Sequence, residues 1–558
     1  MTTPVPAVEP ERFDKPRTGP QIALMSMPTT ERSGPTSAQR PSGLTADGAI
    51  LWAAGAVALL LAVRTAALFV NPGSLYADET QYWLWSRELD WGYYSKPPMI
   101  AWLIALSTAM FGDSDWAVRL FAPLLHTITA CLLGLTAARL YGPRAGAMTA
   151  VMWAVMPAVW LSSGIMSTDA ALMAGLSGAL YAMIRLREGG GWPFAVMLGL
   201  SLAFAFLAKY AAFYFFAGAA LAVLVDAPVR RALMSWRGVL ALAVFAVPAG
   251  GNLAWNAAND FATLSHTADN ANWGADMFNP GEAAAFLADQ LAVFGPIMVI
   301  ALVAAIIAPI VAAVRPWTPD WTAARTELML AAFAAPPLLI VAFQAFLSRA
   351  HANWAAAAYA AGTILAVAFL LRGPRWRRWA LYASIILHVG AGAGMMVLTA
   401  SPRLADAAGA ESAFHRVREW PATADALTGA AGETGAAALV FDNRNDFHQM
   451  QRYGEAIPAP LFMWRRYDGA HNYADTVWPL PPGFEGEVLV VSQRPFEAPL
   501  IAEDFARFEP AGEIVIALGP TRTRRYQLFL AEGYAPVPRD AAFEARARAL
   551  VEASRAQR

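Results

Sequence analysis

The feature that most constrains this chain is a succession of long apolar runs between residues 49 and 400, separated by short polar connections. An apolar run of about 20 residues lets a helix cross the hydrocarbon core of a membrane, and about eleven runs approach that length. They are 49–70, 116–140, 144–162, 167–186, 192–208, 210–225, 236–255, 285–313, 328–347, 354–371 and 377–400. The sequence therefore predicts an α-helical polytopic membrane protein with about eleven or more spans.

Composition supports this fold class and excludes others. The 558 residues are 57% hydrophobic and only 15% charged, and the mean hydropathy is +0.39. A soluble chain of this size carries roughly a quarter charged residues. The net charge of -1 gives no basis for binding nucleic acid. With Cys131 as the single cysteine, an intrachain disulfide and a cysteine-based metal site are both excluded.

Polar segments flank the apolar region at both ends. Residues 1–48 are rich in Pro, Thr, Ser and Arg without apolar periodicity, which predicts a disordered tail. After the predicted transmembrane domain, 49–400, residues 401–558 carry an ordinary density of charge and alternate helical stretches with β-type runs. These runs are Ala438–Phe441, Glu487–Val491, Glu513–Leu518 and Tyr526–Leu530. We therefore expect a small C-terminal α/β domain.

The distribution of arginine predicts the orientation in the membrane. Arg230, Arg231 and Arg237 crowd one connection, four more arginines crowd 372–378, and the connections 71–97 and 256–284 are acidic. Because cytoplasmic loops attract positive residues, the N-terminus and the arginine-rich loops are expected in the cytoplasm. This holds if the short run 98–112 lies on the outer surface instead of crossing. The C-terminal domain then lies outside.

Lysine is rare, and its positions are informative. The lysines are Lys15, Lys96 and Lys209, whereas all other cations among the 41 Lys and Arg residues are arginine. Lys15 lies in the predicted tail, but Lys96 and Lys209 fall on the predicted outer side, where cations are disfavoured. A compact ammonium is a good partner for a phosphate, so we favour phosphate binding over simple interfacial snorkelling.

Carboxylates gather on the same predicted side. Asp78 and Glu79 lie where the first apolar run ends, and adjacent carboxylates can act as a base and as an anchor. An acidic loop is the alternative interpretation. Asp169 follows Ser167-Thr168 at the start of a helix, where a capping role is equally plausible. Further side chains that could line a site are Tyr94, Ser95, Arg119, Tyr210, His266, Arg349, His351 and Asn353.

These motifs together resemble the GT-C type of polytopic glycosyltransferases, which use lipid-linked sugars. The nearest groups are protein O-mannosyltransferases, aminoarabinose lipid A transferases and lipopolysaccharide galacturonosyltransferases. The resemblance covers about residues 50–370. The segments that carry it are Ala77-Asp78-Glu79, Tyr93–Pro98, Ser167–Ala170, Lys209-Tyr210, Asn256–His266 and His351–Trp354. It implies inverting transfer of one sugar from a polyprenyl-phosphate carrier to an acceptor, at the outer face of the bacterial inner membrane.

The resemblance also implies roles for individual residues. Asp78 matches the probable base, Lys96 matches the residue that contacts the donor phosphate, and Asp169 matches a second acidic position. Ser95 stands where aminoarabinose transferases have an acidic, metal-associated residue, so we expect metal dependence to be weak or absent, and the resemblance implies no cofactor with certainty. Glu79 and His266 leave a weak divalent-metal site possible. A departing lipid phosphate needs cations, which Lys96 and Lys209 can supply.

The acceptor stays open among a glycolipid, a polysaccharide and a protein, and we favour a glycolipid. A transporter is the main alternative from another functional class. Transporters place their ionisable residues near mid-membrane, between repeated halves. In this chain the ionisable residues fall at one predicted face, and no internal repeat is visible. The sequence therefore favours a transferase whose partners are a polyprenyl-phosphate sugar, an envelope acceptor and membrane lipids.

Overall fold

The computed structural model describes residues 46–269, 277–314 and 321–556, so the predicted tail 1–48 lies almost entirely outside the described residues. Within this part, six helices are long and apolar enough to cross a membrane, or seven if one bent pair counts as a span. The six are α1 (Ala46–Val70), α4 (Asp115–Arg119) continuing into α5 (Phe121–Tyr141), α8 (Thr168–Arg187), α12 (Trp236–Ala258), α16 (Trp321–Leu347) and α18 (Arg375–Ala400).

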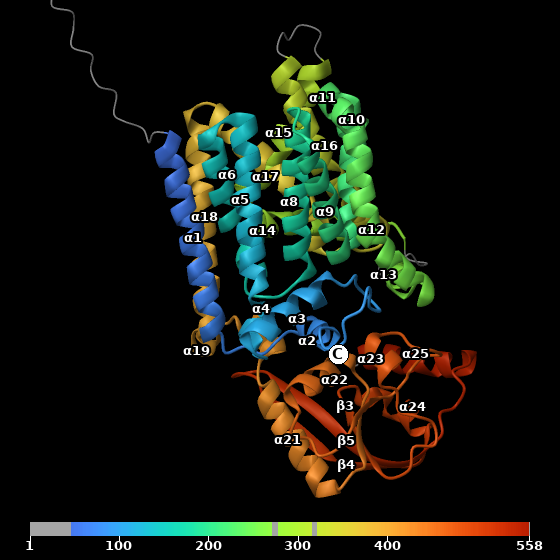
Figure 1. Ribbon diagram of the computed structural model, residues 1–558. Helices are drawn as coiled ribbons and strands as arrows, with labels where there is room; N and C mark the ends of the chain where they lie inside the picture. The colour runs from blue at the N-terminus through green and yellow to red at the C-terminus, as the bar shows by residue number, and fades with distance from the viewer. Residues whose placement is uncertain (1–45, 270–276, 315–320, 557–558) are drawn as a thin grey trace, which may run out of the picture. The chain divides into compact units, whose positions relative to one another are not determined.

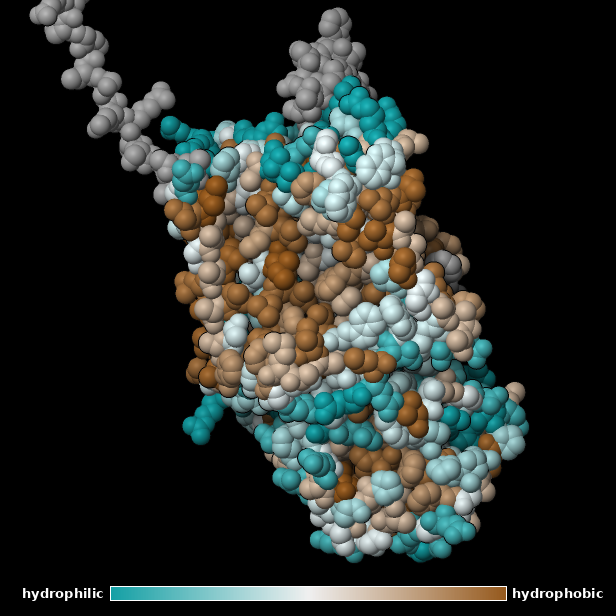
Figure 2. All heavy atoms as spheres, viewed as in Figure 1, coloured by the Kyte–Doolittle hydropathy of each residue, from teal (hydrophilic) through white to brown (hydrophobic). Residues whose placement is uncertain are grey.

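Shorter helices complete the bundle. The apolar ones are α3 (Met99–Phe111), α9 (Trp192–Ala208), the 3-10 turn η1 (Tyr210–Ala212) with α10 (Phe213–Val225), and α17 (Ala358–Arg372). Others are α2 (Ala77–Trp85), α6 (Pro143–Val155), α7 (Pro157–Ser162), α11 (Ala227–Leu233) and α13 (Ala262–Asp269). Figure 2 shows a broad band of hydrophobic side chains across the viewed face of the helical part, as expected of a surface in contact with lipid. The number of spans stays a prediction.

Two of the predicted spans are broken. The run 285–313 is not one straight helix, because α14 (Pro280–Val293) and α15 (Pro296–Val314) meet at an angle of 111°. Gly295 has a positive φ of 91° and Pro296 lacks an amide hydrogen, so the helix cannot continue there. The run 144–162 divides at Met156, which is extended because a proline follows it.

Small residues allow the central helices to pack closely. A Cβ on Gly175 of α8 would lie 2.8 Å from both the Cβ of Ala205 and the carbonyl oxygen of Ser201 on α9. Such close approach of helix backbones is common within membranes, where small residues replace the hydrophobic effect as the source of association. The contact fixes α8, the most buried of the long helices, and with it the outer helix end that carries Asp169.

The C-terminal region contains a five-stranded sheet of order β2-β1-β3-β5-β4. The strands are β1 (Ala438–Phe441), β2 (Leu461–Met463), β3 (Val488–Ser492), β4 (Phe505–Ala517) and β5 (Thr523–Tyr534). The first three are parallel, and β4 and β5 form an antiparallel hairpin. Each of the four predicted β-type runs overlaps a strand, with Glu487 and Leu518 just outside β3 and β4, whereas the three-residue β2 is too short to show a period in the sequence.

Helices cover both faces of this sheet. They include α21 (Trp420–Thr434), α22 (Arg444–Tyr453), α23 (Tyr473–Val477), α24 (Ala498–Ala502) and α25 (Ala541–Ala556), after α19 (Pro402–Ala407) and α20 (Glu411–Phe414). Leu439 and Phe441 pack with Phe447 of α22, and Val440 packs on the other face with Phe543 of α25. This burial explains why the parallel strands are continuously apolar. The domain boundaries and the external location remain predictions.

Side chains of α22 join the sheet region to the start of α2. The Nε2 of Gln449 donates to the carbonyl oxygen of Leu75 at 2.9 Å, and the amide of Leu75 donates to the hydroxyl of Tyr453 at 2.7 Å. Arg452 pairs with Asp113 at 2.7 Å and with Asp115 at 2.9 Å. Figure 1 shows α2 and α3 beside each other at the end of the helical bundle, next to α22.

Candidate active site

Asp78 lies in the first turn of α2 and its side chain is exposed. Its carboxylate forms no hydrogen bond or ion pair with any residue in the described part of the chain. The side chain does lie within electrostatic reach of Lys96. An exposed and unpaired carboxylate is available to accept a proton from a bound hydroxyl group.

Glu79, the next residue, has the opposite environment. Its side chain is 0% exposed and pairs at 2.8 Å with Arg119, which is 3% exposed. The same carboxylate accepts hydrogen bonds from the amides of Met166, at 2.8 Å, and Tyr76, at 2.9 Å. Because neutral and charged donors surround both oxygens, Glu79 is geometrically suited to hold α2 against α4 and the loop before α8. It is not accessible to a substrate.

Lys96 lies in the loop between α2 and α3 and is half-buried. Burial lowers the pKa of its ammonium below the ordinary lysine value, Lys209 lowers it further, and Asp78 and Asp169 act in the opposite direction. Among the described residues its Nζ has no hydrogen-bond partner. A partly buried ammonium without a partner is costly and is suited to receive an anion.

Asp169 and Lys209 form an ion pair. The Nζ of Lys209 lies 2.7 Å from Oδ1 of Asp169, and the Nδ2 of Asn353 donates to Oδ2 of the same carboxylate at 2.6 Å. Each carboxylate oxygen of Asp169 therefore has a side-chain partner: Lys209 follows the end of α9, and Asn353 lies in the turn before α17. This arrangement argues against the capping interpretation of Asp169, because the carboxylate makes no hydrogen bond to the backbone amides of its own helix.

A polar network fixes the loop that carries Lys96. The hydroxyl of Tyr210 donates to Oδ1 of Asn252 at 2.8 Å and accepts from Nδ2 of Asn256 at 3.1 Å. The Nδ2 of Asn252 in turn donates to the carbonyl oxygen of Trp91 at 2.7 Å. Asn252 and Asn256 both lie on the largely apolar α12, and Asn252 is the one that bonds to this loop, while Asn256 holds Tyr210. Through Asn252, Tyr210 thus helps to fix the position of the loop that carries Lys96.

The remaining predicted residues are less central. The ring of Tyr94 lies 5.6 Å from that of His266, and Ser95 beside it is buried. His351 contacts Trp354 edge to face at 5.3 Å, which fits an interfacial anchor. Arg349 is exposed, and no hydrogen bond within residues 46–269, 277–314 and 321–556 joins its guanidinium to the carboxylates of the site.

The possible metal site at Glu79 and His266 has no support in the geometry. Among the residues that the structure describes, no three or more His, Cys, Asp or Glu side chains are grouped so that they could hold a metal ion. Both oxygens of Glu79 are occupied by Arg119 and backbone amides. Dependence of activity on a divalent ion stays a prediction to be tested.

Arg444 is a site residue that the sequence did not reveal. It opens α22, is half-buried, and lies within electrostatic reach of Lys96. Its guanidinium has no ion-pair partner in the described ranges. Residues 401–558 contain many arginines, and nothing in the local sequence distinguishes this one. Only the packing of α22 on α2 brings it near Lys96.

Comparisons with known proteins agree with this geometry. Residues 95–255 match the family described as dolichyl-phosphate-mannose-protein mannosyltransferase. Over 320 residues the chain is 38% identical to the lipid A galacturonosyltransferase RgtD of Rhizobium johnstonii, covering 57% of this chain and 65% of that protein. Over 197 residues it is 28% identical to the undecaprenyl phosphate-α-4-amino-4-deoxy-L-arabinose arabinosyl transferase of Pseudomonas aeruginosa, covering 32% and 34%. The chain thus spans less than two thirds of the length of these relatives.

Solved structures show the fold. The apo structure of ArnT from Cupriavidus metallidurans gives a TM-score of 0.58 at 16% identity, covering 86% of this chain and 98% of ArnT. Its complex with undecaprenyl phosphate gives a TM-score of 0.56 at 17% identity, covering 88% and 99%. The resemblance predicted from the motifs is therefore confirmed: the chain is similar to GT-C glycosyltransferases that use polyprenyl-phosphate sugars.

Proposed function

We propose that this protein is an inverting membrane glycosyltransferase that moves a single sugar from a polyprenyl-phosphate carrier to an envelope glycolipid. The observation that carries this proposal is that two groups without partners among the described residues, the exposed carboxylate of Asp78 and the half-buried ammonium of Lys96, lie within electrostatic reach of each other. Similarity to the lipid A galacturonosyltransferase RgtD supports a glycolipid as the acceptor.

The reaction needs one base and a cationic site for the leaving group. The acceptor hydroxyl oxygen attacks the anomeric carbon, the bond between that carbon and the phosphate oxygen breaks, and the hydroxyl proton passes to Asp78. The carrier phosphate departs with the bonding electrons, and Lys96 with Arg444 would balance its negative charge. No general acid is required, because the phosphate leaves as an anion. A single displacement inverts the anomeric configuration.

The other polar residues would act by positioning these groups. Asp169 neutralises Lys209, so Lys209 is less suited to meet the phosphate than the sequence suggested. Lys209 and Asn353 instead hold the carboxylate of Asp169 beside the proposed sugar site. There the carboxylate could accept hydrogen bonds from sugar hydroxyls. Glu79, predicted as catalytic, would position α2 through its buried ion pair with Arg119.

Orientation follows from the arginine-rich loops. We infer a cytoplasmic N-terminus and a periplasmic C-terminal domain in the bacterial inner membrane, with the site on the periplasmic side. Reporter fusions made after Arg237 and after Arg403 should report opposite sides of the membrane. If both fusions report the same side, the proposed orientation is wrong.

The direct test uses purified protein in lipid nanodiscs, supplied with a polyprenyl-phosphate sugar and lipid A. Mass spectrometry should detect lipid A carrying one added sugar for the wild type and none for Asp78→Asn. Glu88→Gln, a change in an exposed carboxylate just after α2, is the matched control and should behave as the wild type. Transfer by Asp78→Asn within a few-fold of wild type would remove Asp78 from the mechanism.

A protein O-glycosyltransferase is the second candidate. The match of residues 95–255 to a family named for protein mannosyl transfer favours it. Mass spectrometry of lipopolysaccharide, lipids and envelope proteins from cells with and without this gene would separate the two. A sugar lost from proteins, with unchanged lipopolysaccharide, would favour this candidate over the glycolipid acceptor.

A further inference from the structure

Arg64 is a cation inside the first membrane helix that the proposed reaction does not use. It lies six residues before the end of α1, is 5% exposed, and stacks over the ring of Trp160 with its Cζ 4.6 Å from the ring centroid. Its Nη2 donates to the carbonyl oxygen of Ala154. Within the described ranges no carboxylate pairs with it. A buried charge in a membrane helix without a counter-ion is expensive to keep and indicates a function.

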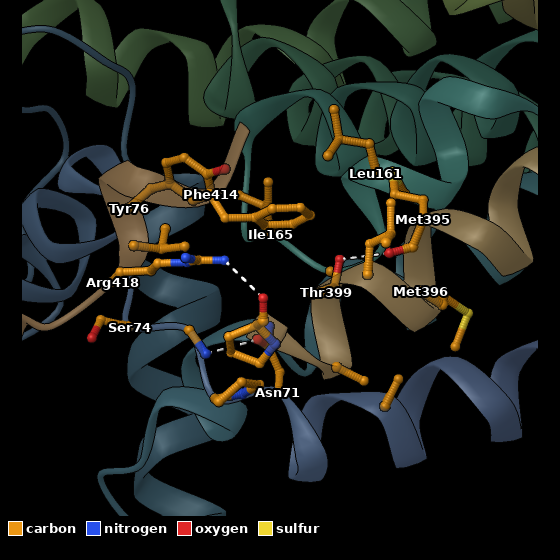
Figure 3. A pocket seen from close by; sticks show the side chains of 18 of the residues that line it. Asn71, Ser74, Tyr76, Leu161, Ile165, Met395, Met396, Thr399, Phe414 and Arg418 are labelled. Carbon is orange, nitrogen blue, oxygen red and sulfur yellow. Dashed lines mark hydrogen bonds between the residues drawn. The ribbon is translucent and has the colours of Figure 1, made fainter. Parts of the chain in front are cut away.

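Arg64 lines a cavity of about 450 Å³. Leu68 of α1, Leu161 of α7 and Met395 of α18 contribute apolar walls, and Arg418 from the loop before α21 closes the cavity on the side of the C-terminal domain. Figure 3 shows Arg418 pointing into the cavity, with Leu161 and Met395 across from it. Cavities of roughly 300–1,000 Å³ with apolar walls and a few polar groups are typical binding sites for small ligands.

Two residues that line this cavity each carry a buried donor without an acceptor. The Nε of Arg64 and the Nε1 of Trp160, a residue 6% exposed, have no hydrogen-bond partner in the described part of the chain. The ring of Trp160 is held by α18, because a Cβ on Gly392 would lie 2.1 Å from it. Arg418 and Arg119 also line the cavity, but Asp406 and Glu79 neutralise them. Arg64 is therefore the cation left to bind an anion.

The position of the cavity identifies which substrate it suits. Lys96, Lys209 and Arg444 are not among its lining residues, so it is separate from the proposed site of the carrier phosphate. Tyr76 does line it, and Asp78 follows two residues later in the first turn of α2. The helices α1 and α18, which both line the cavity, are mostly unburied and so form an outer side of the bundle that can face lipid. The cavity and the carrier site therefore flank the proposed base.

We propose that this cavity binds the acceptor, an anionic glycolipid, with one acceptor phosphate held by Arg64, which stacks on Trp160, and the adjoining chain against α1, α7 and α18. The proposal rests on the proposed transferase function. It is consistent with the need to bring two lipid substrates to Asp78 from different directions. A bulk anionic phospholipid has the same chemistry, so the experiment must distinguish these two sources.

The test uses full-length protein in nanodiscs and measures transfer rate against lipid A and, separately, against the polyprenyl-phosphate sugar. Arg64→Met keeps the length of the side chain and removes the charge. Gly164→Leu fills the cavity, because a Cβ on Gly164 meets only the carbonyl oxygen of Leu161, at 3.7 Å. Loss of a charged hydrogen bond predicts a KM for lipid A at least about tenfold higher in Arg64→Met. The donor KM should change less than about twofold for either variant.

Phosphorylation of the acceptor provides a second measurement. Wild type should prefer lipid A with its phosphates to dephosphorylated lipid A, and Arg64→Met should lose this preference, while Arg64→Lys should retain part of it. Native mass spectrometry should show lipid A bound to the wild type in the presence of excess phosphatidylglycerol, and reduced binding to both variants.

Three results would overturn the proposal. An unchanged KM for lipid A in Arg64→Met and Gly164→Leu would show that the cavity is not used. A raised donor KM instead would assign the cavity to the carrier lipid. Displacement of lipid A by equimolar phosphatidylglycerol would identify a site for bulk membrane lipid. If the wild type transfers no sugar to lipid A, the proposed function fails, whereas the binding measurement still decides what the cavity holds.

Discussion

Glu79→Gln and Asp78→Asn are equivalent changes at adjacent positions for which the structure predicts opposite outcomes. Glu79→Gln leaves the guanidinium of Arg119 buried at 3% exposure without its counter-ion. The amide also cannot accept from every donor that now contacts the carboxylate, which include the amides of Met166 and Tyr76. Breaking a buried ion pair by removing one partner costs about 3–5 kcal/mol. We expect Glu79→Gln to lose folding stability on this scale.

Asp78→Asn removes a charge that is exposed and has no partner among the described residues. Such surface changes usually alter stability by less than about 0.5 kcal/mol. If Asp78 is the base, however, its loss should reduce turnover by about a hundredfold or more. Asp78→Asn should therefore unfold like the wild type and fail to transfer sugar.

Thermal unfolding of the purified proteins in the same detergent, together with turnover per folded molecule, measures both effects. Replacing both members of the buried pair, as Glu79→Gln with Arg119→Met, removes the uncompensated charge and should recover part of the lost stability. A wild-type melting temperature with lost turnover in Glu79→Gln would refute the structural role of Glu79. It would also return Glu79 to the reaction.

Three further predictions concern charge. Burial lowers the pKa of Lys96, so on raising the pH the ammonium loses its charge before an ordinary lysine would. The donor KM should consequently rise with alkaline pH in the wild type, and this rise should be absent in Lys96→Arg, as measured from donor titrations at each pH. Lys209→Met should reduce turnover because it leaves the carboxylate of Asp169 without its ion pair. The double variant Lys209→Met with Asp169→Asn should have a higher melting temperature than Lys209→Met alone. In the C-terminal region, burial raises the pKa of Asp446 to about 7. The folded state then holds a proton that the unfolded chain releases above about pH 4, so stability should fall between pH 4 and pH 7. Asp446→Asn should reduce this slope in melting curves recorded across that range.

The sequence predicted those features of the site that follow from the cost of charge near a membrane. Lys96, Lys209 and Asp169 stood out because apolar surroundings make each charge expensive, and the structure does bring them within electrostatic reach of one another. The bend at Gly295 also had a local signal, since glycine followed by proline is a strong helix breaker. The apolar run continues on both sides of this break, and its continuity predicts a single unbroken span.

The partners of these residues were not predictable in the same way. Glu79 pairs with Arg119 across 40 positions, and Asp169 accepts from Asn353 across 184 positions. No periodicity or spacing rule connects side chains at such separations, because tertiary packing alone brings them together. The exposed Asp78 and the buried Glu79 look equivalent in the sequence for the same reason. Their roles separate only when the burial of each carboxylate is known.

The C-terminal domain therefore has a structural role in the proposed reaction beyond covering the membrane helices. Both backbone groups of Leu75 are bound by α22, through Gln449 and Tyr453, only three residues before Asp78. The hydroxyl of Tyr453 also donates to Asp115 at 2.6 Å, so α22 ties the start of α2 to α4. The same helix begins with Arg444, beside Lys96. A single short helix thus both fixes the backbone that leads to the proposed base and supplies a cation for the proposed leaving group. Loss of α22 packing should therefore impair the base and the phosphate site together.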